Sequence, residues 1–101
     1  MKIIWSQRAI DRAAEEAAFI ASDKPEAAKK WLEGLFVAVD RLASFPRSGK
    51  QVPELPSLEY RQLAYRSHRL VYRVLEDSVA IVTVRRFKQS LQSTDLPEPA
   101  S

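Results

Sequence analysis

The sequence contains no cysteine, a single histidine (His68) and only two glycines. Without cysteine the chain can form neither disulfides nor thiolate metal sites, which fits a reducing cytoplasm. One histidine cannot supply a histidine-rich metal site, and two glycines are too few for a glycine-rich phosphate-binding loop. We therefore expect a cytoplasmic protein with no bound metal and no cofactor.

The sequence also lacks the long apolar segments that membrane insertion and secretion require. No run of about 18 apolar residues could span a bilayer, and residues 1–16 contain neither the apolar core nor the cleavage site of a secretory signal. The 101 residues, 46% hydrophobic and 29% charged, are enough for one modest core. We predict a single soluble domain over residues 1–92 and a flexible polar tail over residues 93–101.

The first half of the sequence predicts a strand and two helices. Residues 2–5 are a short apolar run typical of a strand, and Ser6 is placed to cap the helix that follows. The apolar face of this helix is mostly small, and consists of Ile10, Ala13, Ala14, Ala17, Ile20 and Ala21. A second helix follows Pro25 and runs to about residue 44, where Phe45-Pro46 ends it. Its apolar face contains Ala28, Trp31, Leu32, Leu35, Phe36, Val39, Leu42 and Ala43.

The second half of the sequence predicts a loop and three strands. Residues 47–58 contain prolines and a glycine, which indicates an irregular crossover. Alternation of apolar and polar residues then predicts strands over residues 59–65, 68–75 and 79–87, joined by short polar turns. The last strand is apolar on both faces, so we expect it at the centre of the sheet. Helices and strands that do not alternate predict an α+β fold, in which the N-terminal strand and this three-stranded meander form an antiparallel sheet under a helical hairpin.

Basic residues are concentrated in the predicted strands. Residues 60–88 contain seven arginines and lysines but only two acids, Glu76 and Asp77. On the middle strand, the alternation places Arg69, Val71 and Arg73 on one face. Such a cluster can hold phosphates during RNA cleavage, or it can dock on an acidic protein surface. The structural alternative is that these arginines pair with nearby acids, including those two and Glu59, on neighbouring strands.

Few residues of the chain could act as a catalytic base. His68 has no nucleophile elbow beside it, and we interpret it as a strand-end side chain that is exposed or bonded to the backbone. Glu16 lies on a helix face that we expect to be solvated. Lys88 and Tyr72 remain as candidates for base chemistry on RNA, and Tyr72 is predicted to face the core.

Four segments of the chain, taken in order, form the pattern of a known family. They are IIWSQRAIDRAAEEAAFIA, AAKKWLEGLFVAVDRLASFPRSGKQVPEL, HRLVYRV and VAIVTVRRFKQSL. In that family's pattern, the first segment corresponds to the opening strand and first helix, and the second to a second helix that ends in L-x-x-F-P-x-x-G. The third corresponds to a strand that carries an arginine, and the fourth to the closing strand. This pattern resembles the RelE/ParE superfamily of toxins from bacterial type II toxin–antitoxin modules, often described as plasmid-stabilisation proteins. The resemblance extends over residues 2–92.

The resemblance implies a helical hairpin on an antiparallel sheet, in agreement with the fold predicted above. It also implies a cognate antitoxin as partner and a toxin–antitoxin hetero-oligomer. In this family the antitoxin typically lays a helix or strand on the apolar groove and the sheet of the toxin. Such a partner would account for the apolar residues Trp5, Trp31, Leu35 and Phe36, for which burial in the core is the alternative.

The two branches of the family differ in their target. RelE-like members cut mRNA on the ribosome, whereas ParE-like members bind DNA gyrase and are not nucleases. Arg69 matches the strand arginine that RelE-like enzymes use, and an interferase would rely on Arg61, Arg69, Arg86 and Lys88. The closing strand, however, ends in Arg86-Phe87-Lys88, with lysine where the family pattern has arginine, and no tyrosine or histidine follows.

These departures favour a ParE-like gyrase inhibitor with no catalytic residues over a ribosome-dependent mRNA interferase. A third possibility is an inactive member that binds only antitoxin or nucleic acid. For the gyrase inhibitor, the expected target-binding residues are Arg69, Arg73, Arg85, Arg86 and Lys88.

Overall fold

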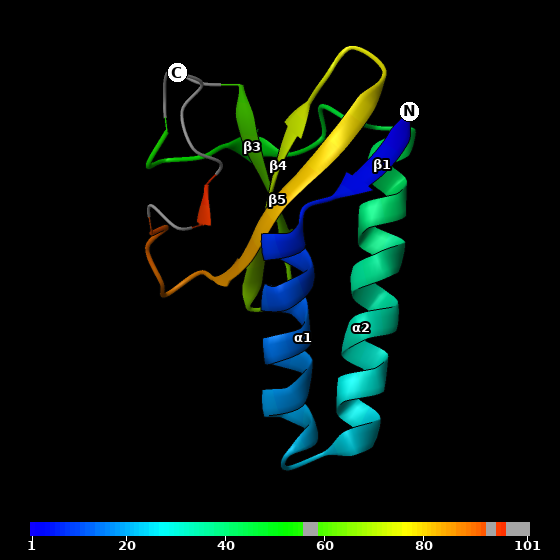
Figure 1. Ribbon diagram of the computed structural model, residues 1–101, viewed down its shortest axis with the longest axis vertical. Helices are drawn as coiled ribbons and strands as arrows, with labels where there is room; N and C mark the ends of the chain where they lie inside the picture. The colour runs from blue at the N-terminus through cyan, green and yellow to red at the C-terminus, as the bar shows by residue number, and fades with distance from the viewer. Residues whose placement is uncertain (56–58, 93–94, 97–101) are drawn as a thin grey trace.

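The chain folds into a helical hairpin that covers one face of a five-stranded sheet, as the computed structural model shows (Figure 1). The structure describes residues 1–55, 59–92 and 95–96. The elements are β1 (Lys2–Trp5), α1 (Gln7–Ala21), α2 (Pro25–Asp40), the 3₁₀ turn η1 (Arg41–Ala43), β2 (Lys50–Gln51), β3 (Tyr60–Tyr65), β4 (His68–Val74) and β5 (Ser78–Arg86). The predicted α+β class is confirmed, and each predicted helix and strand is present.

The sheet has the strand order β1-β5-β4-β3-β2 and is mixed rather than wholly antiparallel. β1 pairs with β5 in parallel, and all other neighbours pair antiparallel. The predicted irregular crossover contains the short strand β2, which pairs Lys50 with Gln62 and Gln51 with Arg61. β5 lies between β1 and β4, which confirms its predicted central position.

α1 begins at the predicted cap, because the Ser6 hydroxyl accepts a hydrogen bond from the Ala9 amide at 2.9 Å. Its buried side is the line Ala9, Ala13 and Ala17, so the helix is rotated relative to the predicted face, and Ile10 is 46% exposed. The alanine and isoleucine positions spread widely around α1. Their periodicity therefore does not fix which line of small side chains packs inward.

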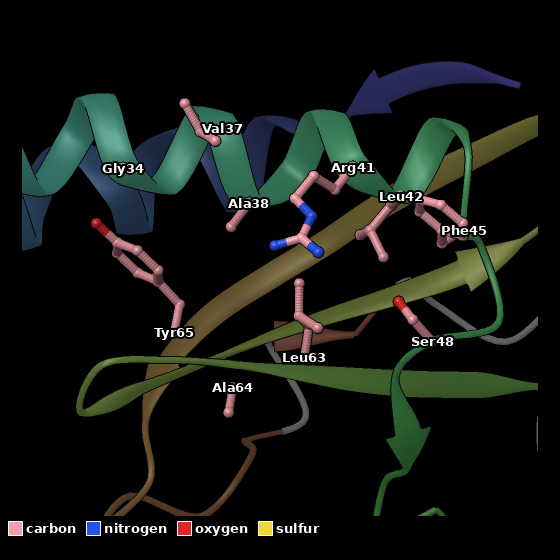
Figure 2. A pocket seen from close by; sticks show the side chains of 10 residues that line it. All are labelled: Gly34, Val37, Ala38, Arg41, Leu42, Phe45, Ser48, Leu63, Ala64 and Tyr65. Carbon is pink, nitrogen blue, oxygen red and sulfur yellow. The ribbon is translucent and has the colours of Figure 1, made fainter.

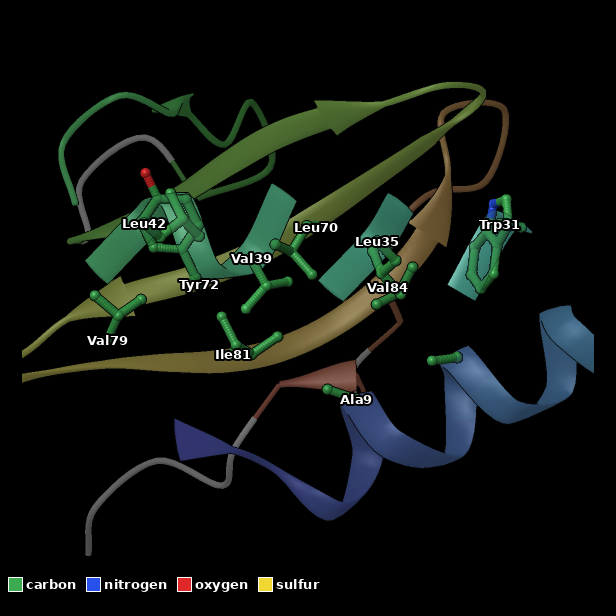
Figure 3. Close-up of a cluster of buried hydrophobic side chains, with 11 residues drawn as sticks. Ala9, Trp31, Leu35, Val39, Leu42, Leu70, Tyr72, Val79, Ile81 and Val84 are labelled. Atoms are coloured by element: carbon green, nitrogen blue, oxygen red, sulfur yellow. The ribbon is translucent and has the colours of Figure 1, made fainter. Parts of the chain in front are cut away.

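The main core lies between the helical hairpin and the sheet (Figure 3). Leu35 and Val39 of α2, continued by Leu42 of η1, point toward the strands. The residues of β4 and β5 that meet them are Leu70, Tyr72, Val79, Ile81 and Val84. This core confirms that Tyr72 faces inward, and its hydroxyl accepts a hydrogen bond from the Gly49 amide at 2.8 Å.

The other face of the sheet has a smaller core of its own. Val71, Val82 and Tyr60 pack there with Val52, and the residues that cover them are Leu55, Leu91 and Leu96. The loop after β2 and the segment after β5 therefore close the sheet face that the helices leave open.

Part of the segment predicted to be a flexible tail is packed on this second core. Asp95 is 1% exposed, and Leu96 contacts the second core. The prediction of a free tail therefore fails for these two residues, because ion pairs and apolar contacts hold them. The remaining residues of that predicted tail, 93–94 and 97–101, lie outside the described residues.

A β-bulge in β5 changes which residues of this strand face the helices. The pairing steps from Ile81 opposite Tyr72 to Thr83 opposite the preceding residue of β4, so Val82 has no partner on that strand. One extra residue reverses the alternation of side chains, because successive residues of a strand point to opposite faces. The last two residues of β5 consequently exchange the faces that a regular strand would give them.

The two glycines offer a matched test of this packing. A Cβ at Gly49 would lie 2.7 Å from the Gln62 carbonyl oxygen and 2.5 Å from the Tyr72 hydroxyl. Neither atom can retreat easily, so we expect Gly49→Ala to lower the free energy of unfolding by about 2–3 kcal/mol. At Gly34 the new methyl would meet only the end of the Tyr65 side chain. Because alanine also has the higher helix propensity, Gly34→Ala should change stability by less than about 1 kcal/mol. Urea unfolding measures both, and equal losses would contradict this account.

Candidate functional site

Three of the predicted target-binding residues, Arg69, Arg73 and Arg85, lie on the sheet face away from the helices. Arg69 and Arg85 stand opposite each other on β4 and β5. Like charges in that position repel one another, and these two residues are only 4% and 8% exposed. The folded arrangement therefore requires anionic groups beside the two arginines.

Glu54, in the loop after β2, compensates the charge of Arg69. The two carboxylate oxygens accept hydrogen bonds from Arg69 Nη1 and Nη2 at 2.8 and 2.6 Å. Nη1 also donates to Gln62 Oε1 at 3.1 Å, and Nη2 donates to the Gln89 carbonyl at 2.8 Å. The hydrogen bonds from Arg69 lower the pKa of Glu54 to about 2. The carboxylate is therefore charged throughout the physiological pH range.

Asp95, in the segment after β5, compensates the charge of Arg85. Its side chain is fully buried, with Arg85 Nε at 3.5 Å and Arg12 Nε of α1 at 3.0 Å. The same carboxylate accepts hydrogen bonds from the Thr83 hydroxyl at 3.2 Å and from the Gln92 amide at 2.9 Å. Asp95 thus joins α1, β5 and the C-terminal segment.

Arg73 forms the cross-strand type of pair that the sequence offered as the structural alternative. It donates to Glu59 at 2.6 Å, and its guanidinium lies 5.4 Å from the centroid of the Tyr60 ring. The two other candidate acids, Glu76 and Asp77, are exposed and form no ion pair within the described residues. Arg73 is 34% exposed at its side chain and Glu59 is 55% exposed, so this pair is solvated.

Arg86 lies on the helix side of the sheet, where it joins Glu16 and His68. Glu16 Oε2 lies 2.8 Å from His68 Nε2, and Arg86 Nε and Nη2 donate to the same oxygen at 3.3 Å. The predictions of a solvated Glu16 and of a His68 exposed or bonded to the backbone are wrong, since their side chains are 19% and 9% exposed. The two residues are 52 positions apart in the chain, so no local pattern reveals their contact.

The residues expected for an mRNA interferase do not share one face of the sheet. Arg61 lies on the helix side beside β2, where it donates to the carbonyl groups of Arg47 and Gly49, whereas Arg69 lies on the opposite face. The candidate base Tyr72 is fully buried. Burial also raises the pKa of the Tyr72 hydroxyl, which keeps it protonated.

The apolar residues expected to bind an antitoxin divide into core and surface residues. Trp31 and Leu35 are 3% and 0% exposed, which removes them from any accessible surface. Trp5 is half-buried and Phe36 is 50% exposed, and their rings meet edge to face with centroids 5.6 Å apart. With Ile10 and other residues of the hairpin they line a hollow of about 390 Å³, which we call the apolar hollow.

A second concavity, a groove of about 500 Å³, lies between α2 and β3 (Figure 2). Val37 and Phe45 border it and are each 62% exposed. Figure 2 shows the Arg41 guanidinium extending from the helix toward Leu63 of β3. None of the residues predicted to bind a target or an antitoxin lines this groove.

The described part of the chain was also searched for metal-binding groups of side chains and for helices that could span a membrane. Its histidine, aspartate and glutamate side chains form no group of three that could hold a metal ion. Neither helix in it is long and apolar enough to cross a bilayer.

Comparison with known sequences identifies relatives of nearly the full length of the chain. The family model described as "ParE toxin of type II toxin-antitoxin system, parDE" matches residues 3–91. A protein of Sinorhizobium fredii (strain NBRC 101917 / NGR234) named "Putative toxin Y4kP" is 35% identical over 88 residues, which are 87% of this chain and 90% of that protein.

Solved structures share the fold at low sequence identity. The chromosomal ParDE TA system from P. aeruginosa aligns with a TM-score of 0.70 and 19% identity over 85% of this chain and 95% of that one. The toxin–antitoxin complex RelBE2 from Mycobacterium tuberculosis aligns with a TM-score of 0.56 and 17% identity, over 84% and 95% of the two chains. At these identities the likeness concerns the fold.

The ion pair of Glu54 and Arg69 should give a pH-dependent contribution to stability. The folded-state pKa of Glu54, about 2, is below its ordinary value of 4.5. The stabilisation is therefore complete above about pH 4.5 and is lost as the pH falls toward 2. Because the carboxylate is 33% exposed, solvent screens the pair, and we expect Glu54→Gln to cost about 1–2 kcal/mol at pH 7. Urea unfolding should show a smaller difference between the two proteins at pH 3, and a constant difference would refute the assignment.

Asp95→Asn should be more destabilising than the loss of an exposed ion pair. The substitution leaves the buried Arg85 and its neighbour Arg12 without their shared anion, which we expect to cost about 3–4 kcal/mol. Glu59→Gln, which breaks the solvated pair with Arg73, serves as the control and should leave stability nearly unchanged. Thermal and urea unfolding measure both variants. Similar small losses would mean that the segment after β5 is not held by Asp95.

Proposed function

Because this chain belongs to the ParE toxin family of type II toxin–antitoxin systems, we propose that it arrests growth by binding DNA gyrase directly. We further propose that a cognate antitoxin neutralises it in a hetero-oligomeric complex in the cytoplasm. In this proposal the chain has no catalytic residue and acts by occupying a surface of its target.

The observation that carries the proposal is which basic residues are buried in ion pairs and which are accessible at the surface. Arg69 and Arg85 are buried and paired with carboxylates, so they are not accessible to a nucleic acid in this conformation. Arg86 is 41% exposed at its side chain, and Lys88 is exposed and has no ion pair within the described residues. A few accessible cations at the end of β5 suit docking on an acidic protein surface.

The apolar hollow supports an antitoxin partner. Exposed aromatic rings such as Phe36, next to the half-buried Trp5, leave apolar surface that a partner's apolar helix face could cover. Two structures with this fold contain such partners by their descriptions, namely the ParDE system and the RelBE2 toxin–antitoxin complex. We propose that the antitoxin of this chain contacts Trp5 and Phe36.

An mRNA interferase is the second candidate, and one observation favours it. Arg69 and Arg85 stand opposite each other, and the Nε atoms of both are buried without a hydrogen bond in the described structure. Displacement of Glu54 and Asp95 would free this arginine pair for a phosphate. The position of Arg61 and Arg86 on the helix side of the sheet, opposite to the face of Arg69, weighs against it.

Pulse labelling of DNA and protein synthesis, just after induction in bacteria, separates these functions. We expect DNA synthesis to stop first, and purified chain to inhibit supercoiling by purified gyrase. Protein synthesis stopping first would favour the interferase, and no arrest of either would indicate a chain that only binds its antitoxin.

The charge at the end of β5 can be tested in the same assays. Lys88→Glu should weaken gyrase inhibition by about five- to tenfold, because it reverses an accessible charge. Lys29→Glu makes the same change in charge at an exposed position of α2 and should leave inhibition unchanged. Equal effects of the two variants would mean that only net charge matters.

A further inference from the structure

The helical hairpin extends past the end of β5 (Figure 1). A pocket lies between this part of the hairpin and the end of the strand. Its walls come from the end of α1, the connection to α2, the β3–β4 turn and the residues after β5. Its volume is about 620 Å³, within the range of roughly 300–1,000 Å³ that is typical of binding pockets. We call it the hairpin-end pocket, after its position and its rim residues Phe19, Phe87 and Lys88.

The polar side of the hairpin-end pocket is already organised. Glu16 is bonded to both His68 and Arg86, so its negative charge is compensated. The Arg86 guanidinium also lies 4.8 Å from the centroid of the Phe19 ring, which fixes it between a carboxylate and an aromatic face. A partner that binds here therefore meets a preformed wall, which lowers the entropy lost on binding.

The rim of the pocket exposes aromatic surface. Phe19 is 54% exposed and Phe87 is 47% exposed. The Phe87 amide donates to the Ser67 carbonyl at 3.0 Å, so the backbone that presents this ring is held by the β3–β4 turn. Covering two exposed rings removes apolar area from water, at about 25 cal/mol per Å². The occupant of this pocket should therefore bring an apolar side chain.

The charges around the rim determine which residues of the occupant can lie next to that apolar side chain. Lys24 and Lys88 are both exposed, and neither forms an ion pair within the described residues. Because Arg86 and Glu16 are paired with each other, the charges left at the rim are these two lysines and the Asp23 carboxylate, so positive charge is in excess. This excess of cations attracts carboxylates.

We propose that the hairpin-end pocket binds a segment of the toxin's protein target that presents an apolar side chain flanked by carboxylates. This inference rests on the proposed function and names the feature of the target that is recognised. A nucleic acid suits the pocket less well, because the excess of positive charge around it is small and nucleic-acid binding relies on neutralising several phosphates.

Three acetylated and amidated pentapeptides test the chemistry on the full chain. Glu-Asp-Phe-Asp-Glu carries both features, Glu-Asp-Gly-Asp-Glu lacks the anchor, and Gln-Asn-Phe-Asn-Gln lacks the carboxylates. We expect the first to bind about tenfold more tightly than either control, with amide shifts confined to residues 16–24, 66–68 and 86–88 in NMR titrations. Equal affinity for all three, or shifts elsewhere on the chain, would overturn the proposal, as would tighter binding of a single-stranded oligonucleotide at the same residues.

A pair of matched variants links the pocket to the target. Phe87→Ser removes a rim aromatic and should weaken binding of the first peptide about tenfold, whereas Phe45→Ser removes an exposed phenylalanine near the α2–β3 groove and should not. Gyrase inhibition should fall in Phe87→Ser alone. Peptide binding that depends on Phe87 while inhibition does not would overturn the assignment to the target. Inhibition by the unaltered chain without any peptide binding would overturn the pocket and leave the proposed function standing.

Discussion

The second face of the sheet depends on the neutralisation of two arginines that are buried opposite each other. Arg69 and Arg85 could not both be packed between β4, β5 and the covering segments without Glu54 and Asp95 beside them. Both carboxylates come from segments outside the regular strands, so the ion pairs fix where the loop after β2 and the segment after β5 lie. Replacing a buried ion pair by apolar residues often costs nothing, whereas breaking one is costly. The pairs therefore serve chiefly to specify this arrangement of the covering segments, and Arg12 extends it to α1.

The bulge at Val82 decides which arginine enters which environment. In a regular strand, Arg86 would share a face with Val82 and Arg85 would share a face with Ile81. The extra residue reverses this order, so that Arg85 meets Asp95 on one face and Arg86 lies over α1 on the other. The two adjacent arginines thus lie in different environments. Arg85 is buried beside Asp95, whereas Arg86 borders the hairpin-end pocket.

Local patterns were sufficient for both helices and the longer strands, but not for β2 or for the contacts between elements. The alternation in residues 68–75 and 79–87 predicts β4 and the central strand β5, since one period describes each of them. β2 has only two residues and forms because β3 is beside it, so no local period marks it. The rotation of α1 depends on the sheet beneath it. The sequence does not separate Trp5 and Phe36 from Trp31 and Leu35, because which of these apolar side chains are buried follows from how α2 packs.

The charge of a sequence window is a poor guide to the charge that a folded protein presents. Seven bases and two acids in residues 60–88 suggest an open cationic face. The acids that neutralise this window lie outside it, on α1, in the loop before β3 and in the segment after β5, where Glu16, Glu54, Glu59 and Asp95 are found. The positive charge available to a partner is consequently moved from the sheet face to the end of β5. Lys88 adjoins exposed aromatic rings there, and this combination suits a protein surface better than a phosphate backbone.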